Sequence, residues 1–174
     1  MLWWDDRAVA AAWVVIGPSG AGKSTLLASY LPDHPELELV RTHTTRPMRL
    51  DETDTHVFVT EAEFGRTRFL GTANVFGARY GLAPWTTTRT AVVMLRAFAV
   101  EQFLGLFGAA RVLQVQAPVP VLVERLRARG DADRAVAAAL QAEIDVGLTW
   151  ADVVVDTSGP VAQSLARLDE ALRG

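Results

Sequence analysis

Short apolar runs alternate along the chain with longer segments in which apolar residues recur at helical spacing. The run WVVI at residues 13–16 contains no polar position, which is typical of a strand buried on both faces. Similar runs predict further strands, at residues 37–40, 57–59, 90–95, 111–116 and 151–156. Because strands and helices alternate, the sequence predicts an α/β fold with a mainly parallel sheet and helices on both faces.

Helices are predicted between these strands, at residues 23–30, from 60 onward, and at 96–107, 118–130, 131–148 and 159–173. Thr60 and Glu63 form a capping-box pattern, in which each side chain can bind a free backbone N–H of the other residue. The last predicted helix is amphipathic, because its leucines at 165, 168 and 172 fall on one face.

Composition excludes several classes of function. The 174 residues carry a formal net charge of −3, so no basic field is available to attract nucleic acid. The longest apolar run, AVAAAWVVI, is too short to span a bilayer, and no membrane partner is expected. The absence of cysteine excludes disulfides and thiolate metal sites, and fits a cytoplasmic protein.

The segment GPSGAGKST at residues 17–25 matches the phosphate-binding pattern G-x-x-x-x-G-K-[ST] in full. An apolar strand precedes it and a helix follows, so backbone N–H groups and the helix N-terminus can bind anionic phosphates. Lys23 can reach the β- and γ-phosphates of ATP, and the Ser24 hydroxyl can bind Mg²⁺. The expected ATP-binding residues are Gly17, Pro18, Ser19, Gly20, Ala21, Gly22, Lys23, Ser24 and Thr25.

Two further features of the sequence bear on which reaction the bound nucleotide takes part in. A GTPase switch or motor needs an acidic residue for Mg²⁺ at a strand end, but the strand predicted at 90–95 ends in Met94 and Leu95 and is followed by Arg96. The segment RTHTTRPMR at residues 41–49 carries three arginines after a strand, at the sheet edge where ligands bind. Arginine forks match phosphate oxygens, although a solvated loop with surface ion pairs is the simpler alternative.

The segments GPSGAGKST, THTTRPMR, EAEF, VFGARYG and ERLRARG, in this order and spacing, resemble the guanylate-kinase group of P-loop kinases. The resemblance extends from about residue 13 to residue 129 and is looser toward the C-terminus. It implies a three-layer P-loop kinase fold, built as a single domain over residues 1–174. The implied core comprises residues 12–40 and 90–174, with an acceptor-binding insertion at 41–89 and a short lid at about 129–140.

The same resemblance assigns roles to individual residues. Arg46 and Arg49 are implied to grip the phosphate of the acceptor, and Tyr80 matches a tyrosine that also binds it. His56 stands where the family has a second such tyrosine, and is equally compatible with a partly buried strand position. The full implied acceptor-binding set is Thr42, Arg46, Arg49, His56, Tyr80 and Arg96.

The implied lid is reduced. Together with Lys23, the implied catalytic residues are Arg129 and Arg134. The family carries a further lid arginine at a place that falls here on Val136 or Leu140, so Arg134 is the nearby substitute. An exposed surface position is an equally good interpretation of Arg134.

The sequence also departs from a guanylate kinase where the base is read. Gly71 replaces an acidic residue, and the segment VVMLRA, with Arg96, replaces a second one. Guanine offers an N1–H and an amino group, and a site without acceptors discriminates poorly for it. The sequence resembles ribose 1,5-bisphosphate phosphokinases in these departures, in the histidine that ends the loop DETDTH, and in the arginine at 96.

We therefore expect an ATP- and Mg²⁺-dependent kinase that phosphorylates the phosphate of a small acceptor, with ribose 1,5-bisphosphate slightly favoured and the product phosphoribosyl diphosphate. A guanylate kinase or another nucleoside monophosphate kinase is the alternative. A non-catalytic guanylate-kinase-like binding module and a nucleotide-driven switch also remain open. We expect a monomer or homodimer.

Overall fold

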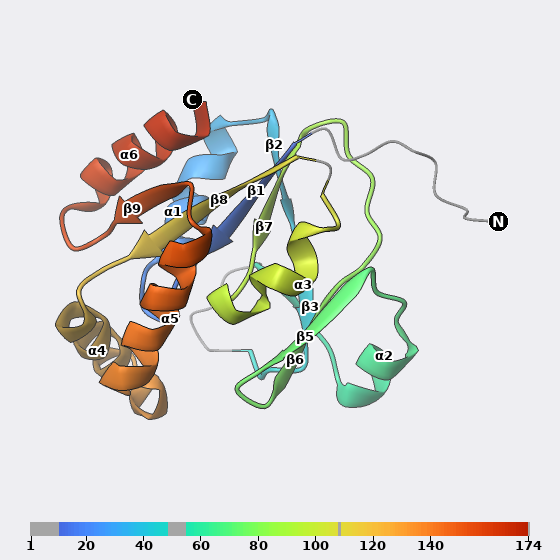
Figure 1. Cartoon of the computed structure of the whole chain (residues 1–174), viewed down its shortest axis with the longest axis horizontal. Helices are drawn as coiled ribbons and strands as arrows, with labels where there is room; N and C mark the ends of the chain where they lie inside the picture. Colours follow the sequence, from blue (N-terminus) through green and yellow to red (C-terminus); the bar gives the residue numbers. More distant parts are fainter. Residues whose placement is uncertain (1–10, 49–54, 108, 174) are drawn as a thin grey trace.

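The computed structural model describes residues 11–48, 55–107 and 109–173. Its central sheet has five parallel strands in the order β2, β7, β1, β8, β9 (Figure 1). Their bounds are β1 Ala12–Ile16, β2 Leu37–Val40, β7 Thr90–Met94, β8 Ala110–Gln116 and β9 Val153–Asp156. The predicted α/β class with a mainly parallel sheet is confirmed.

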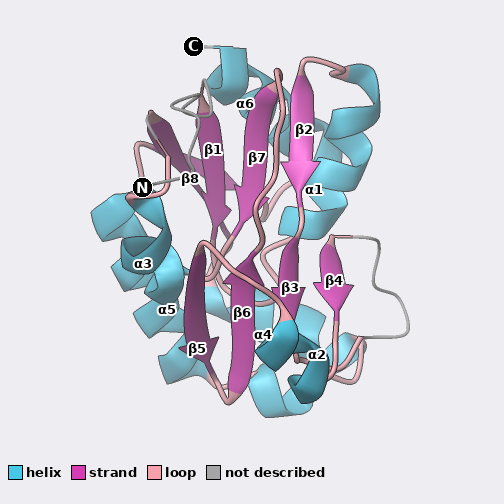
Figure 2. Ribbon diagram, turned by 90° about the vertical axis from the view of Figure 1, so that its right-hand side faces the viewer, coloured by secondary structure: helices cyan, strands magenta, loops and turns pink. Residues whose placement is uncertain are grey.

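Helices cover both faces of this sheet (Figure 2). Helices α1 (Lys23–Tyr30) and α6 (Val161–Arg173) lie on one face, and α3 (Val100–Leu104) and α5 (Ala137–Trp150) lie on the other. Side chains of β1 alternate between the two layers: Trp13 and Val15 join the cluster that contains α1 and α6, whereas Val14 and Ile16 join the cluster that contains α3. Burial on both faces explains why this strand contains only apolar residues.

A second, smaller sheet is inserted between β2 and β7, with strands in the order β4, β3, β6, β5. The bounds are β3 Thr42–Thr44, β4 His56–Phe58, β5 Gly71–Val75 and β6 Ala78–Leu82. Strands β3 and β4 are parallel, and the other two pairings are antiparallel. The β5–β6 hairpin places Val75 and Leu82 in the core beside α3, so the smaller sheet is anchored to the larger one.

Several element bounds differ from the predictions. The sequence predicted a polar loop where β3 lies and did not predict β5 or β6 at all. The helix predicted at 96–107 is a 3₁₀ turn, η2 (Ala97–Ala99), followed by the short α3. The helix predicted at 131–148 begins as a separate 3₁₀ turn, η3 (Ala132–Arg134), and α5 starts only at Ala137.

Other local predictions are confirmed. Helix α2 (Glu61–Arg66) starts with the capping box: Thr60 Oγ1 accepts from the Glu63 N–H at 3.2 Å, and the Glu63 carboxylate accepts from the Thr60 N–H at 2.7 Å. Helix α4 (Val119–Ala128) ends before Gly130, which has a φ of +79°. The 3₁₀ turn η1 (Leu31–Asp33) closes α1. Within the described residues, no helix is long and apolar enough to cross a membrane.

Candidate active site

The loop between β1 and α1 has the conformation of a phosphate cradle. Gly17 and Gly22 have φ values of +140° and +88°, which L-residues with a side chain rarely adopt. A Cβ atom on Gly17 would lie 1.9 Å from the backbone oxygen of Val115, so this close approach requires glycine. Helix α1 has no side-chain cap at Gly22, which leaves its N-terminal backbone N–H groups for a ligand.

Lys23 is held at the centre of this loop. Its Nζ donates hydrogen bonds to the backbone oxygens of Gly17 at 2.5 Å and Pro18 at 3.0 Å. These bonds fold the long side chain back over the loop, where its charge can meet a phosphate. This position is compatible with the predicted role of Lys23 at the β- and γ-phosphates of ATP.

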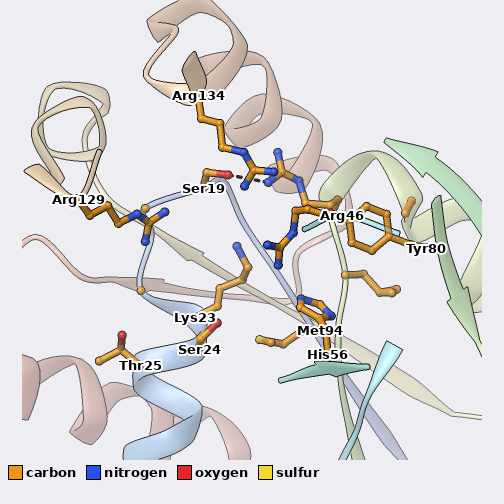
Figure 3. Close-up of a pocket in the computed structure, with 15 residues that line it drawn as sticks. Ser19, Lys23, Ser24, Thr25, Arg46, His56, Tyr80, Met94, Arg129 and Arg134 are labelled. Carbon is orange, nitrogen blue, oxygen red and sulfur yellow. Dashed lines mark hydrogen bonds between the residues drawn. The ribbon is translucent and has the colours of Figure 1, made fainter. Parts of the chain in front are cut away.

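One cavity brings together the phosphate loop, the smaller sheet and the segment after α4 (Figure 3). In Figure 3, Lys23 and Ser24 face Arg46, His56 and Tyr80 across the cavity, and the side chains of Arg129 and Arg134 reach the same cavity from two other directions. The lining residues are Ser19, Gly20, Gly22, Lys23, Ser24, Thr25, Arg46, His56, Tyr80, Met94, Leu95, Arg96, Ala99, Arg129 and Arg134. Three of the predicted loop residues, Gly17, Pro18 and Ala21, shape the loop without lining the cavity.

The acceptor half of the cavity is built by the smaller sheet. Arg46 follows β3, is 9% exposed, and donates from Nη1 to the backbone oxygen of Pro47 at 2.8 Å. Its guanidinium lies 5.2 Å from the ring centre of Phe58. The rings of His56 on β4 and Tyr80 on β6 meet edge to face at 6.1 Å. Three predicted phosphate-binding side chains therefore come together from separate strands or their ends.

Thr42, which the sequence predicted to bind the acceptor, does not line the cavity. Thr42 is 1% exposed, and its Oγ1 lies 2.8 Å from His56 Nδ1. Its hydroxyl therefore supports the His56 ring, which does line the cavity. The predicted Arg49 lies outside the described residues.

Arg96 is bonded to two other elements of the site. Its Nη1 donates to Ser19 Oγ at 2.8 Å, and its Nη2 donates to Glu143 Oε2 at 2.6 Å. Burial raises the pKa of the Glu143 carboxyl, while the charge of Arg96 opposes that rise. Sequence reasoning missed Glu143, because a single glutamate in an alanine-rich helix gives no sign of being buried.

The two lid arginines both reach the cavity. Arg129 is the C-cap of α4, and its Nε donates to Asp131 Oδ2 at 3.1 Å. Arg134 ends the turn η3, which directs it toward the phosphate loop (Figure 3). Val136 is 53% exposed and Leu140 is buried in the core, so neither position replaces Arg134 at the cavity.

Comparisons with known proteins agree with this architecture. A family described as an AAA domain matches residues 13–152. The guanylate kinase of Nitrosococcus oceani is 37% identical over 145 residues, which cover 72% of this chain and 68% of that protein. The chain belongs to the guanylate-kinase-like P-loop kinases. The relatives are named guanylate kinases, which are ATP-dependent kinases, and this protein is one too.

A second relative supports the membership of this guanylate-kinase-like chain, and a solved structure supports its fold. The guanylate kinase of Synechocystis sp. is 33% identical over 148 residues, which cover 76% of this chain and 78% of that protein. The crystal structure of guanylate kinase from Anaplasma phagocytophilum shares the fold, with a TM-score of 0.68 at 21% identity. That match covers 96% of this chain and 86% of the other.

The guanylate-kinase-like chain has a second cavity beside the phosphate loop, which the sequence did not predict. It is lined by Gly20, Gly22, Thr25, Leu26, Arg125, Arg129, Thr157, Gly159, Val161 and Ser164. Arg125 donates to the backbone oxygens of Gly20 at 3.3 Å and Thr157 at 2.5 Å. The Thr157 hydroxyl donates to the backbone oxygen of Ala21 at 2.8 Å, so these side chains fix the outer side of the loop.

The metal expectation rests on Ser24 alone. Its hydroxyl lies at the start of α1 and lines the cavity beside Lys23. Among the described residues, no group of three or more His, Cys, Asp or Glu side chains could hold a metal ion. The residues present therefore suit an ion that is held mainly by phosphate oxygens and one hydroxyl, as Mg²⁺ commonly is with nucleotides.

Proposed function

We propose that the protein transfers the γ-phosphoryl group of ATP to the phosphate of a small phosphorylated acceptor, with GMP as the leading acceptor. The observation that carries this proposal is a single cavity in which Lys23 of the phosphate loop faces Arg46 and Tyr80 of the smaller sheet. The names of the relatives support GMP, and favour it over the ribose 1,5-bisphosphate predicted from the sequence.

The donor half binds ATP through backbone and charge. The triphosphate would lie on the N–H groups of the loop that ends at Gly22, with Lys23 against the β- and γ-phosphates. The nucleoside would extend into the second cavity, beside Arg125 and Thr157. Mg²⁺, held by Ser24 and phosphate oxygens, would neutralise charge on the triphosphate.

The acceptor half would place the acceptor's phosphate next to the γ-phosphate of ATP. Arg46 would bind two of its oxygens, and Tyr80 and His56 would each donate one hydrogen bond. A remaining oxygen of the acceptor phosphate attacks the γ-phosphorus, and the bond to the β–γ bridging oxygen breaks, which releases ADP. A phosphate is already anionic, so no strong general base is needed.

The lid arginines would act at the moment of transfer. Arg129 and Arg134 line the same cavity as Lys23 and Arg46, where they can offset the negative charge that moves between donor and acceptor. Donors placed in advance at such a point contribute most to catalysis, because they need no reorganisation during the reaction.

Ribose 1,5-bisphosphate remains the second candidate, and one observation favours it. Among the described residues, no Asp or Glu lines the cavity, so none of the described carboxylates can accept from the N1–H and amino group of guanine there. An acidic side chain in place of Gly71 would be crowded, because Leu106 Cδ1 lies only 3.1 Å from an ideal Cβ atom at this position. Arg96 adds a cation that suits a second phosphate better than a base.

Coupled ADP release with ATP and Mg²⁺ tests both candidates against GMP, dGMP, AMP, UMP and ribose 1,5-bisphosphate. We expect turnover with GMP; turnover with ribose 1,5-bisphosphate alone would reverse the order of the two. ATP binding without turnover on any acceptor would indicate a binding module. Lys23→Ala should abolish turnover, and Arg46→Ala should mainly weaken acceptor binding and rate, so an active Lys23→Ala variant would refute the scheme.

The lid has its own test with a matched control. Arg134→Ala should lower kcat by about 100-fold, the loss typical for one transition-state donor. Arg127 is exposed in the last turn of α4 and does not line the cavity, so Arg127→Ala should leave kcat unchanged. Equal kcat values for the two variants would show that Arg134 belongs to the surface.

A further inference from the structure

The proposed mechanism leaves one buried charged residue without a role. Glu143 lies on α5, is 1% exposed, and its only salt bridge among the described residues is the 2.6 Å contact with Arg96. Taking a carboxylate and a guanidinium out of water costs several kcal/mol per ion, and their attraction often does no more than offset that cost. A buried pair of this kind is therefore weak evidence for a stabilising role, and its position becomes the informative feature.

The Arg96–Glu143 pair lies where three parts of the site meet. Arg96 follows β7, and its side chain is 14% exposed and lines the cavity. Its Nη1 donates to Ser19 Oγ of the phosphate loop, and its guanidinium lies 5.1 Å from the ring centre of Phe76 at the β5–β6 turn. Glu143 itself belongs to the helix that follows Arg134 and the lid. The guanidinium thus joins the donor loop, the acceptor hairpin and the lid segment.

Glu143 holds the Arg96 guanidinium in one position. A free arginine has several rotatable bonds and would leave the cavity for solvent in many rotamers. With Nη2 bonded to Glu143 and Nη1 bonded to Ser19, the guanidinium plane is fixed by two elements that lie far apart in sequence. A cation that is already in place when the phosphates arrive loses no further rotamer freedom on binding them.

We propose that Glu143 is a positioning residue, which holds the Arg96 guanidinium beside Ser19 so that its charge acts on the phosphates in the cavity. This inference rests on the proposed phosphoryl transfer. Glu143 touches neither donor nor acceptor and acts on them through Arg96, although its charge also interacts with that of Lys23. In a protein that already lacks Arg96, its removal should therefore cause no further loss of activity.

Glu143→Gln, Arg96→Gln and the double variant form the test, with kcat and KM measured on whichever acceptor the wild type uses. Glu143→Gln should lower kcat at least tenfold, and the double variant should equal Arg96→Gln alone. Glu143→Asp keeps the charge and should recover part of the loss. Glu170→Gln, an exposed glutamate on α6, is the control and should behave as the wild type.

Binding of inorganic tripolyphosphate, followed by calorimetry, extends the test to a protein that turns over none of the acceptors. Glu143→Gln and Arg96→Gln should each weaken this affinity about fivefold or more, without further loss in the double variant. An inactive wild type whose tripolyphosphate binding follows this pattern would overturn the proposed function but keep the role of Glu143.

Two results would overturn the role of Glu143 itself. One is a Glu143→Gln variant with unchanged kcat and unchanged tripolyphosphate affinity in an active protein. The other is a double variant whose losses multiply, which would show that Glu143 acts independently of Arg96. If the first result came with a lowered Tm, the pair would be purely structural.

Discussion

Replacing Gly17 by alanine tests whether the close approach of the phosphate loop to β8 is obligatory. Gly22 adopts the left-handed conformation, in which alanine costs about 1–2 kcal/mol, and the φ of +140° at Gly17 lies in a region that alanine adopts even less readily, so the backbone strain there is at least as large. At Gly17 the new Cβ would also lie 1.9 Å from the backbone oxygen of Val115, far inside the roughly 3.5 Å of a normal contact. At Gly22 nothing lies within 4 Å, so this residue provides the matched control.

The extra overlap at Gly17 should cost about 1–3 kcal/mol, as overpacking against atoms that cannot move does. Gly17→Ala is therefore expected to lose about 2–5 kcal/mol of unfolding free energy, and Gly22→Ala about 1–2 kcal/mol. Urea unfolding without nucleotide measures both, with the slope of the transition checked for constancy. Equal losses for the two variants, within about 0.5 kcal/mol, would refute the reasoning, because they share only the strain of positive φ.

Three other predictions concern stability. Thr60→Ala should cost about 1 kcal/mol in urea unfolding by removing the cap of α2; no loss would contradict the capping box. Burial, with the hydrogen bond to Asp169, raises the pKa of Tyr30 to about 12. Phenol absorbance should therefore show one late titration, which Tyr30→Phe removes. The stability that the neutral Tyr30 phenol contributes should be complete below pH 10 and lost toward pH 12. The hydrogen bond from the Ser158 side chain lowers the pKa of Asp156. The stability that the ionised Asp156 contributes is therefore present above the unfolded pKa of about 3.9 and lost at lower pH. Asp156→Asn should flatten the acid side of the curve of unfolding free energy against pH.

The donor half of the site could be predicted from the sequence because its determinants are local. The strand before Gly17, the glycine spacing and the helix after Gly22 all lie within about one turn of the residues that they position. The same applies to the cap at Thr60. Each of these features depends on neighbours in the chain, and the structure has the predicted loop, helix start and capping box.

The acceptor half could be predicted only in part, because its geometry depends on pairings between distant residues. Strands β5 and β6 contain glycines and polar residues that are exposed or half-buried, and only pairings such as Thr44 with Tyr80 make them strands. The hydroxyl of Thr42 was expected to reach the acceptor, but its strand turns it toward His56. The burial of Glu143 likewise depends on Arg96, which lies far away in sequence.

The insertion of the smaller sheet also affects the cost of folding. The chain leaves β2 at Val40 and returns to its neighbour β7 at Thr90, so the pairing of these strands closes a loop of about fifty residues. Loop-closure entropy grows only with the logarithm of length, so doubling or halving that segment changes the stability of the larger sheet by about 0.6 kcal/mol. A protein of this architecture can therefore lengthen or shorten its acceptor-binding segment at little thermodynamic cost, provided that Val75 and Leu82 continue to fill the core.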